Sequence, residues 1–130
     1  MAIVRYVGFA WLERSVPPYA PSRRSASAQV RISTAPAWVH DLDDREFLAL
    51  QHVVRRVARA VAAVLPTERM YCLSLGSQQG NAHLHWHIAP LPPGVPYHQQ
   101  QYHALMAENG VLDVDDTTQA ALASSIRNHL

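Results

Sequence analysis

The longest regular pattern of apolar positions in the chain lies between residues 47 and 64. Apolar side chains recur there at steps of three and four residues, a spacing that places them on one face of a helix. Asp43 or Asp44 can cap the N-terminus, because an aspartate oxygen accepts hydrogen bonds from the first free backbone N–H groups, and Pro66 ends the helix. We therefore predict an amphipathic helix over residues 44–65. Its apolar face comprises Phe47, Leu50, Val54, Val57, Val61 and Val64.

Shorter segments with alternating or β-prone apolar residues are predicted to be strands. They cover residues 1–14, Gln29–Ser33, Met70–Leu75 and His83–Ala89. The sequence GSQQGNA lies between the last two, and its glycines indicate a turn. The order of helix, strand, turn and strand predicts an antiparallel hairpin with a helix on one face. The fold class is therefore α+β, with an antiparallel sheet.

The remaining segments are predicted from their helix breakers and caps. Residues 15–28 are rich in proline, serine and arginine and are predicted to form a loop, and the four prolines of residues 90–96 argue against regular structure there. A short helix is predicted across Gln99–Glu108, with a left-handed cap at Asn109-Gly110. A last helix is predicted from about Asp116 to His129, with an aspartate at its N-terminus.

The composition excludes several classes of protein. With 130 residues, of which 48% are hydrophobic and 16% charged, the chain fits one soluble domain. The net charge of +1 gives no support for specific nucleic-acid binding or an anionic membrane surface, and no apolar stretch is long enough for a membrane span. The cations other than histidine are all arginine, which excludes Schiff-base chemistry on lysine. The apolar N-terminal run lacks a small-residue cleavage site, so we expect a cytoplasmic protein.

Cys72 is the single cysteine of the chain. It cannot form an intramolecular disulfide or belong to a cysteine-based zinc site. Because its neighbours Tyr71, Leu73 and Leu75 are large and mostly apolar, we predict a packed thiol on a strand rather than a nucleophile.

Three histidines, His83, His85 and His87, alternate with large apolar residues. On a strand this alternation places the imidazoles on one face, with about 6.6–7 Å between successive ones, and the apolar side chains on the other. Three histidines are an unusual choice for packing, because each ring brings a donor and an acceptor that need partners. The apolar face, which can pack against the long helix, comprises Leu84, Trp86 and Ile88.

Three interpretations of this cluster are open. The histidines can be polar residues on the wet side of a sheet. They can also bind a metal, since histidines at i and i+2 of a strand chelate zinc or iron, and His98 or His103 would complete the site. No carboxylate lies near the cluster in the sequence, although partners of metal-bound histidines usually include one. Phosphoryl chemistry explains the cluster better, because adjacent imidazoles can divide the tasks of nucleophile and proton donor.

The glycine turn before the cluster supports phosphoryl chemistry. Its backbone N–H groups can face an oxyanion, and Gly80 lets the backbone approach closely. Ser77 and Asn81 add side-chain donors.

The sequence HLHWHIAP, from His83 to Pro90, resembles the histidine triad (HIT) motif, in which three histidines alternate with hydrophobic residues. The likeness extends upstream to the long helix and covers residues 40–90. The sequence is similar to the bacterial branch of the family, in which a tryptophan lies between the second and third histidines. It implies one HIT-like domain over residues 1–130, with about five strands, one long helix packed on the sheet and C-terminal helices. The implied parts are a divergent N-terminal part (1–38), a HIT core (39–90) and a C-terminal extension (91–130).

The resemblance implies a nucleotidyl hydrolase or transferase that cleaves dinucleoside polyphosphates or nucleoside phosphoramidates at the α-phosphate. By this resemblance, His85 attacks the α-phosphorus and carries a covalent nucleotidyl group, His83 hydrogen-bonds the phosphoryl or leaving-group oxygen, and His87 supports the network. The core step needs no metal or other cofactor, and family members are typically homodimers. The implied substrate contacts are Ser77, Gly80, Asn81 and His40.

The stretch before the long helix departs from the family pattern, a strand that ends in proline–lysine–x–histidine. Residues 33–40 read STAPAWVH, and only Pro36 and His40 correspond to that pattern. The acidic residue that helps to bind ribose has no clear counterpart in residues 17–28. Either the N-terminal half has diverged, or residues 15–38 are translated from a shifted reading frame. A nucleotide-binding or regulatory module with weak catalysis, and a metal-binding protein, are therefore the alternative functions.

Other polar and aromatic residues have ordinary structural interpretations. A solvated helix face is predicted for Arg55, Arg56 and Arg59. A helix start that covers the core or the dimer interface is predicted for Tyr97, Tyr102 and Gln99–Gln101. Core or interface packing, rather than base stacking, is predicted for Trp11 and Trp38.

Overall fold

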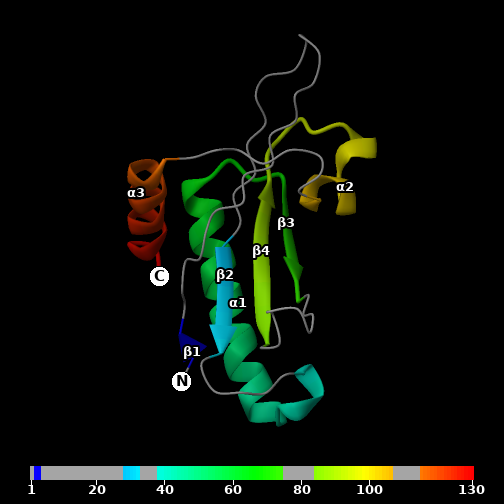
Figure 1. Ribbon diagram of the computed structural model, residues 1–130, viewed down its shortest axis with the longest axis vertical. Coiled ribbons are helices and arrows are strands. Elements are labelled where there is room, and N and C mark those ends of the chain that lie inside the picture. Colours follow the sequence, from blue (N-terminus) through cyan, green and yellow to red (C-terminus); the bar gives the residue numbers. More distant parts are fainter. Residues whose placement is uncertain (1, 4–27, 33–37, 75–83, 107–114) are drawn as a thin grey trace.

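The structure, a computed structural model, describes residues 2–3, 28–32, 38–74, 84–106 and 115–130. Figure 1 shows an antiparallel sheet with a long helix, α1, behind it and a second helix, α3, beside α1. The strands are β1 (Ala2–Ile3), β2 (Ala28–Ile32), β3 (Arg69–Leu73) and β4 (His85–Leu91). The helices are η1 (Val39–Asp41), α1 (Asp44–Val64), η2 (Tyr97–Gln99), α2 (Tyr102–Leu105) and α3 (Asp116–Arg127), where η marks a 3₁₀ helix.

The sheet has the strand order β1-β2-β4-β3, and its paired strands are antiparallel. The predicted α+β class is therefore confirmed. The described residues supply four of the about five predicted strands, with β2 and β3 close to their predicted positions. Of the strand predicted over residues 1–14, only Ala2–Ile3 belongs to the described part, and residues 15–27 of the predicted loop lie outside it.

The long helix forms as its sequence predicts. Asp43 is its N-cap: the carboxylate accepts the N–H of Glu46 at 2.8 Å, and the Glu46 carboxylate accepts the N–H of Asp43 at 3.1 Å. This reciprocal arrangement satisfies two backbone donors that a helix start leaves without partners. At the other end the helix stops at Val64, and Leu65 has an extended backbone before Pro66.

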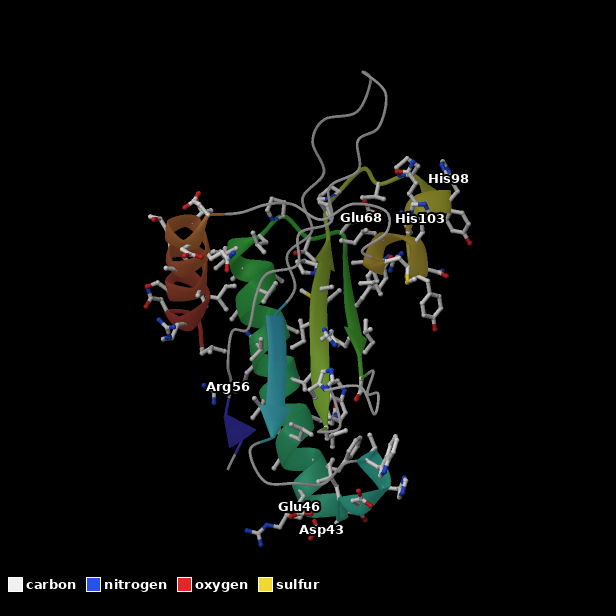
Figure 2. The ribbon with its side chains drawn as sticks, viewed as in Figure 1. Asp43, Glu46, Arg56, Glu68, His98 and His103 are labelled. Atoms are coloured by element: carbon white, nitrogen blue, oxygen red, sulfur yellow. The ribbon has the colours of Figure 1, made fainter. Side chains whose placement is uncertain are left out.

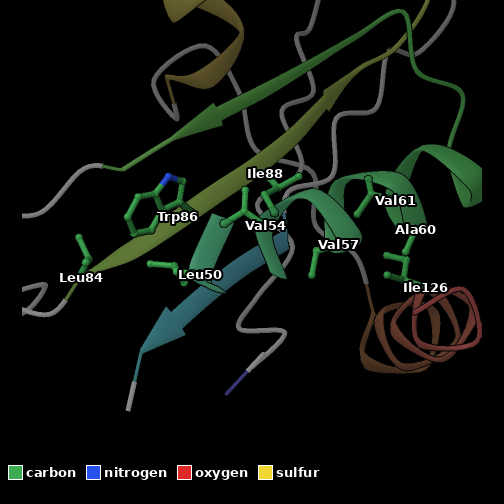
Figure 3. Packing of buried hydrophobic residues seen from close by; sticks show 9 residues of the cluster. All are labelled: Leu50, Val54, Val57, Ala60, Val61, Leu84, Trp86, Ile88 and Ile126. Carbon is green, nitrogen blue, oxygen red and sulfur yellow. The ribbon is translucent and has the colours of Figure 1, made fainter. Parts of the chain in front are cut away.

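The core lies between α1, the sheet and α3 (Figure 3). The apolar residues of β4 pack against α1, as the alternation predicts, and Ile126 of α3 lies beside Ala60. Ile126, Ile88 and Val57 are fully buried, and complete burial of such a side chain stabilises the fold by about 1.5–3 kcal/mol. The buried members of this cluster are Leu50, Val54, Val57, Ala60, Val61, Leu84, Trp86, Ile88 and Ile126.

The arginines of α1 lie on the solvent-exposed side of the helix, as predicted. One of them also joins the C-terminal segment to α1, because the Arg56 guanidinium donates a hydrogen bond to the carbonyl oxygen of Leu130. None of the helices that the structure describes is long and apolar enough to cross a bilayer.

Pro90 lies inside β4, so the prediction that residues 90–96 lack regular structure is wrong at its start. Pro90 pairs with Met70 of β3, and among the described residues the pairs of β2 with β4 run to Ile88. The Leu91 carbonyl accepts a hydrogen bond from Glu68, on the β3 side, so the neighbouring Pro90 nitrogen is directed to the opposite side. A strand tolerates proline where no ladder bond needs its N–H.

Of the short helix predicted across Gln99–Glu108, the structure confirms the part Tyr102–Leu105 as α2, while the separate 3₁₀ turn η2 precedes it and residues 107–108 lie outside the described residues. Gln101 interrupts it with φ +57° and ψ −131°, a conformation that non-glycine residues rarely adopt. Its N–H donates to the Tyr71 hydroxyl at 2.9 Å, a contact that the local sequence does not indicate. The predicted cap at Asn109-Gly110 lies outside the described residues. The last helix is confirmed as α3, with Asp115 as its N-cap.

The predicted packing of Cys72 is wrong, and Trp38 does not pack in the core. Cys72 lies on a strand but is exposed, because β3 is at the edge of the sheet and α1 covers the central strand. The partial burial that remains raises the pKa of the thiol, which disfavours the nucleophilic thiolate. Trp38 is 51% exposed and is not part of the core, so only the interface half of the prediction for it remains, as a prediction. Trp11 lies outside the described residues.

Candidate active site

Two of the three triad histidines, His85 and His87, lie on β4, near the middle of the sheet. They are two residues apart on one strand and therefore share a face, while Trp86 and Ile88 are buried against α1 on the other. His85 is only 1% exposed and His87 is half-buried. The alternation of imidazole and apolar side chain that the sequence predicts is confirmed for this described part of the motif.

The two imidazoles contact each other directly. The Nε2 atoms of His85 and His87 are 3.0 Å apart, and the ring centroids are 4.8 Å apart at an interplanar angle of 74°. The rings are therefore closer than the about 6.6–7 Å expected from the strand repeat, because they turn toward one another to form a hydrogen bond. One Nε2 must carry a proton and donate it, and the other must accept with its lone pair.

The environment of His87 favours its neutral form. Burial lowers the pKa of His87, and the nearby His85 lowers it further, since a second positive charge beside a first is unfavourable. The lowered pKa thus makes His87 a neutral neighbour for His85. A neutral imidazole of this kind can act as a nucleophile, a base or a hydrogen-bond acceptor.

The backbone of β4 at the two histidines is paired with neighbouring strands. In the register of the sheet, His85 lies opposite Arg31 of β2, and His87 lies between Gln29 of β2 and Leu73 of β3. The His87 position is thus flanked by strands on both sides, which restricts how far its backbone can move. A site on the central strand of a sheet is more rigidly placed than one on a loop.

The same face of β4 continues through Ala89 and Leu91, both buried. Tyr71 of β3 is the register partner of Ala89, and its hydroxyl accepts the N–H of Gln101. This hydrogen bond ties the η2–α2 segment to the sheet beyond the histidine pair. Sequence reasoning missed this connection, because its two ends are far apart in the chain and neither residue type indicates the other.

Several predicted site residues cannot be placed. His83, Ser77, Gly80 and Asn81 lie outside the described residues, so their roles stay predictions. His40 is described: it is exposed on η1, its ring is parallel to that of Trp38, and its Nε2 is 3.8 Å from Asp41 Oδ1. The structure thus brings together His85 and His87 and places His40 on a separate element.

The residues proposed to complete a metal site lie away from the pair. Figure 2 places His98 and His103 near Glu68, at the end of the sheet where β4 terminates. From His87 to Leu91 the strand rises about 13 Å, whereas zinc is about 2.0–2.1 Å from each histidine nitrogen. Within the described ranges, no group of three or more histidine, cysteine, aspartate or glutamate side chains is arranged to hold a metal ion.

Three crystal structures resemble this fold. A histidine triad protein from Sinorhizobium meliloti has a TM-score of 0.67 and 16% identity, and the match covers 84% of this chain and 82% of that one. A histidine triad protein from Bradyrhizobium japonicum has a TM-score of 0.65 and 17% identity, with 92% and 90% covered. A Hit-like protein from Bartonella henselae, described as involved in cell-cycle regulation, has a TM-score of 0.59 and 15% identity, with 95% and 88% covered.

No protein-family model and no curated protein matches the chain. The structural likeness is nevertheless consistent across three proteins and most of their length. The chain therefore has the fold of histidine triad proteins, as the motif on β4 predicts. At these identities the likeness shows the fold alone.

Proposed function

We propose that this chain, which has the histidine triad fold, is a nucleotidyl hydrolase or transferase that acts at the α-phosphate of a nucleotide through a covalent intermediate on His85. The observation that carries the proposal is the hydrogen-bonded pair of His85 and His87, 3.0 Å apart on the central strand. Such a pair supplies a neutral nitrogen nucleophile and an adjacent proton carrier, the two groups that phosphoryl transfer through histidine requires.

In the proposed reaction the lone pair of His85 Nε2 attacks the α-phosphorus, and the bond from phosphorus to the leaving group breaks. The leaving group takes up a proton from solvent. A water molecule then attacks the same phosphorus and gives up a proton to solvent, the bond to His85 breaks, and a nucleoside monophosphate leaves. Before the first attack the hydrogen bond between the two Nε2 atoms must break, because it occupies the His85 lone pair when His87 donates; the His87 N–H can then donate to a phosphoryl oxygen.

The remaining roles extend the proposal to predicted residues. His83 would hydrogen-bond the phosphoryl or leaving-group oxygen, and the loop donors Ser77, Gly80 and Asn81 would bind the phosphate. The substrate class is a dinucleoside polyphosphate or a nucleoside phosphoramidate, and the active form is a homodimer. The core step requires no metal.

A second candidate function is nucleotide binding with weak turnover. It is favoured by the burial of His85, which is 1% exposed and whose Nε2 is engaged by His87. A nucleophile in this state must exchange its partner for the phosphorus atom before it can react. The two candidate functions differ in turnover, not in the ligand that they bind.

Hydrolysis of adenosine phosphoramidate and of a dinucleoside polyphosphate, in the presence of EDTA, tests the proposal. The wild type and His98→Ala, a histidine at the far end of the sheet, are expected to release the nucleoside monophosphate. His85→Ala is expected to be inactive, and the wild type should show an acid-labile nucleotidyl adduct after a rapid quench. Equal activity in His85→Ala, or activity that disappears with EDTA, would contradict the mechanism. Binding of adenosine monophosphate (AMP) without any turnover would favour the second candidate.

A further inference from the structure

Trp38 exposes 51% of its surface and stands just before α1. Its backbone is fixed on both sides: the Trp38 N–H donates to Asp41 Oδ2 at 2.9 Å, and the Asp41 N–H donates to the Trp38 carbonyl at 3.2 Å. Most exposed large side chains lose conformational freedom when they bind a ligand. Because the backbone of Trp38 is fixed, only its side-chain torsions remain to be ordered, so the indole offers a flat surface at a low entropic cost.

A second ring lies parallel to this indole. The rings of Trp38 and His40 are within 4° of parallel, with centroids 6.4 Å apart. Asp41 contacts both residues, since its Oδ2 accepts the Trp38 N–H and its Oδ1 is 3.8 Å from His40 Nε2. One carboxylate therefore contacts the backbone of Trp38 and the ring of His40, and the two parallel rings suit a planar ligand.

This platform lies at the end of the sheet that carries the histidine pair. Leu50, on an early turn of α1, packs near Leu84 and Trp86 (Figure 3), so α1 starts at the end of β4 where His85 lies. The η1 turn immediately precedes α1 and lies at the same end of the molecule (Figure 1).

The chain also limits the distance between the platform and the pair. Ile32 follows Arg31, the register partner of His85, and only five residues lie between Ile32 and Trp38, which makes six residue steps. At 3.3–3.6 Å per extended residue, Trp38 lies within about 20 Å of Ile32.

We propose that Trp38 and His40 form the platform on which the base of the nucleotide stacks while its phosphate lies at His85. The inference deepens the proposed function and rests on it. It reverses the interpretation of Trp38 as a core or interface residue rather than a base-stacking one, and it gives His40, the predicted substrate contact, a specific role. Stacking on such a ring is tolerant of base identity, because every base presents a flat π face.

Equilibrium binding of two probes, AMP and ribose 5-phosphate, separates the base from the phosphate. Trp38→Ala is expected to weaken AMP binding by about 5-fold to 150-fold, and to leave ribose 5-phosphate binding unchanged. Trp38→Phe keeps a ring and should retain part of the affinity. Asp41→Ala, which removes the contacts to the Trp38 backbone and the His40 ring, should weaken AMP binding as well. Tyr97→Ala, which removes an aromatic side chain that is 85% exposed at the other end of the sheet, is the matched control.

The outcomes distinguish the platform from the function on which it rests. Equal AMP affinity in the wild type and Trp38→Ala would overturn the platform and leave the proposed function standing. An equal loss of AMP and ribose 5-phosphate binding in Trp38→Ala would also overturn the platform. The substitution would then weaken phosphate binding as much as base binding, which stacking on the indole does not explain. A wild type that binds neither probe would contradict the proposed function and the platform with it. Thermal unfolding of each variant shows whether the fold is intact.

Discussion

The backbone N–H of Gln101 donates a hydrogen bond to the hydroxyl of Tyr71, thirty residues earlier, over 2.9 Å. Gln101 keeps a positive φ of 57° in this position, which costs a non-glycine residue about 1–3 kcal/mol. The bond fastens the η2–α2 segment to β3, on the face of the sheet that carries the histidines. The hydrogen bond to Tyr71 therefore offsets part of the backbone strain at Gln101.

Gln101→Gly is expected to stabilise the protein, because glycine adopts this backbone conformation without a steric penalty. The expected gain is about 1 kcal/mol after the entropy of the unfolded glycine is counted, or about 3–5 °C in Tm. Thermal unfolding measures the change. Gln101→Ala is the matched control, since it truncates the same side chain and keeps the strain. If the alanine variant gained as much as the glycine variant, the side chain and not the backbone would be the cause.

The stability of the protein should fall as the pH falls below about 6.5, the ordinary pKa of histidine. The folded-state pKa of His87 is lowered, so the unfolded chain binds a proton more readily than the folded one. The contribution of His87 to the free energy of unfolding is fully present above the pKa that His87 has in the unfolded chain. It is lost as the pH falls toward the pKa that His87 has in the folded protein. Urea unfolding at pH 7.5 and 5.5 measures the loss, which should be smaller in His87→Gln. A wild type and variant with the same pH dependence would assign the effect to other histidines.

Removal of the α1 cap should destabilise the fold measurably. Asp43→Ala loses the acceptor for the Glu46 N–H and is expected to cost about 1 kcal/mol. Asp43→Asn keeps a capping oxygen and should cost less. Urea unfolding of both variants, with Arg55→Ala as an exposed control on the same helix, measures the difference. An Asp43→Ala variant as stable as the control would mean that water replaces the cap.

Ile126→Ala should separate α3 from α1. Ile126 is completely buried in the core, and truncation of such a residue to alanine costs about 2–5 kcal/mol. Leu48→Ala, at a position that is 60% exposed, should change stability by less than about 0.5 kcal/mol. Urea unfolding compares them. Similar losses for the two variants would indicate that α3 packs loosely in solution.

The parts of the fold that follow from the sequence are those with local causes. The position of α1 follows from a cap, a helical period and Pro66, and the packing of Trp86 and Ile88 follows from strict alternation. The kink at Gln101 could not be predicted, because its partner Tyr71 lies on a distant strand. Residue type alone likewise gave no measure of exposure for Cys72, whose exposure depends on its place at the edge of the sheet.

The sequence predicts the position of the candidate site but not its detailed geometry. Alternation places His85 and His87 on one face, and the motif indicates the fold. The direct Nε2 contact was not predictable, because it depends on how the rings turn and not on the strand repeat. The exposed platform had one overlooked signal: Asp41 stands three residues after Trp38, the spacing at which a carboxylate can accept the backbone N–H at a helix start.

Pro90 also affects how the folded protein meets other chains. An open strand edge with free N–H donors is a template for intermolecular β-pairing, which is the first contact in many aggregates. Among the described residues the β2–β4 pairs run to Ile88, and the next position of β4 that faces that side is Pro90, which has no N–H to offer. On that side of β4 the strand therefore gives a foreign chain no backbone donor at Pro90.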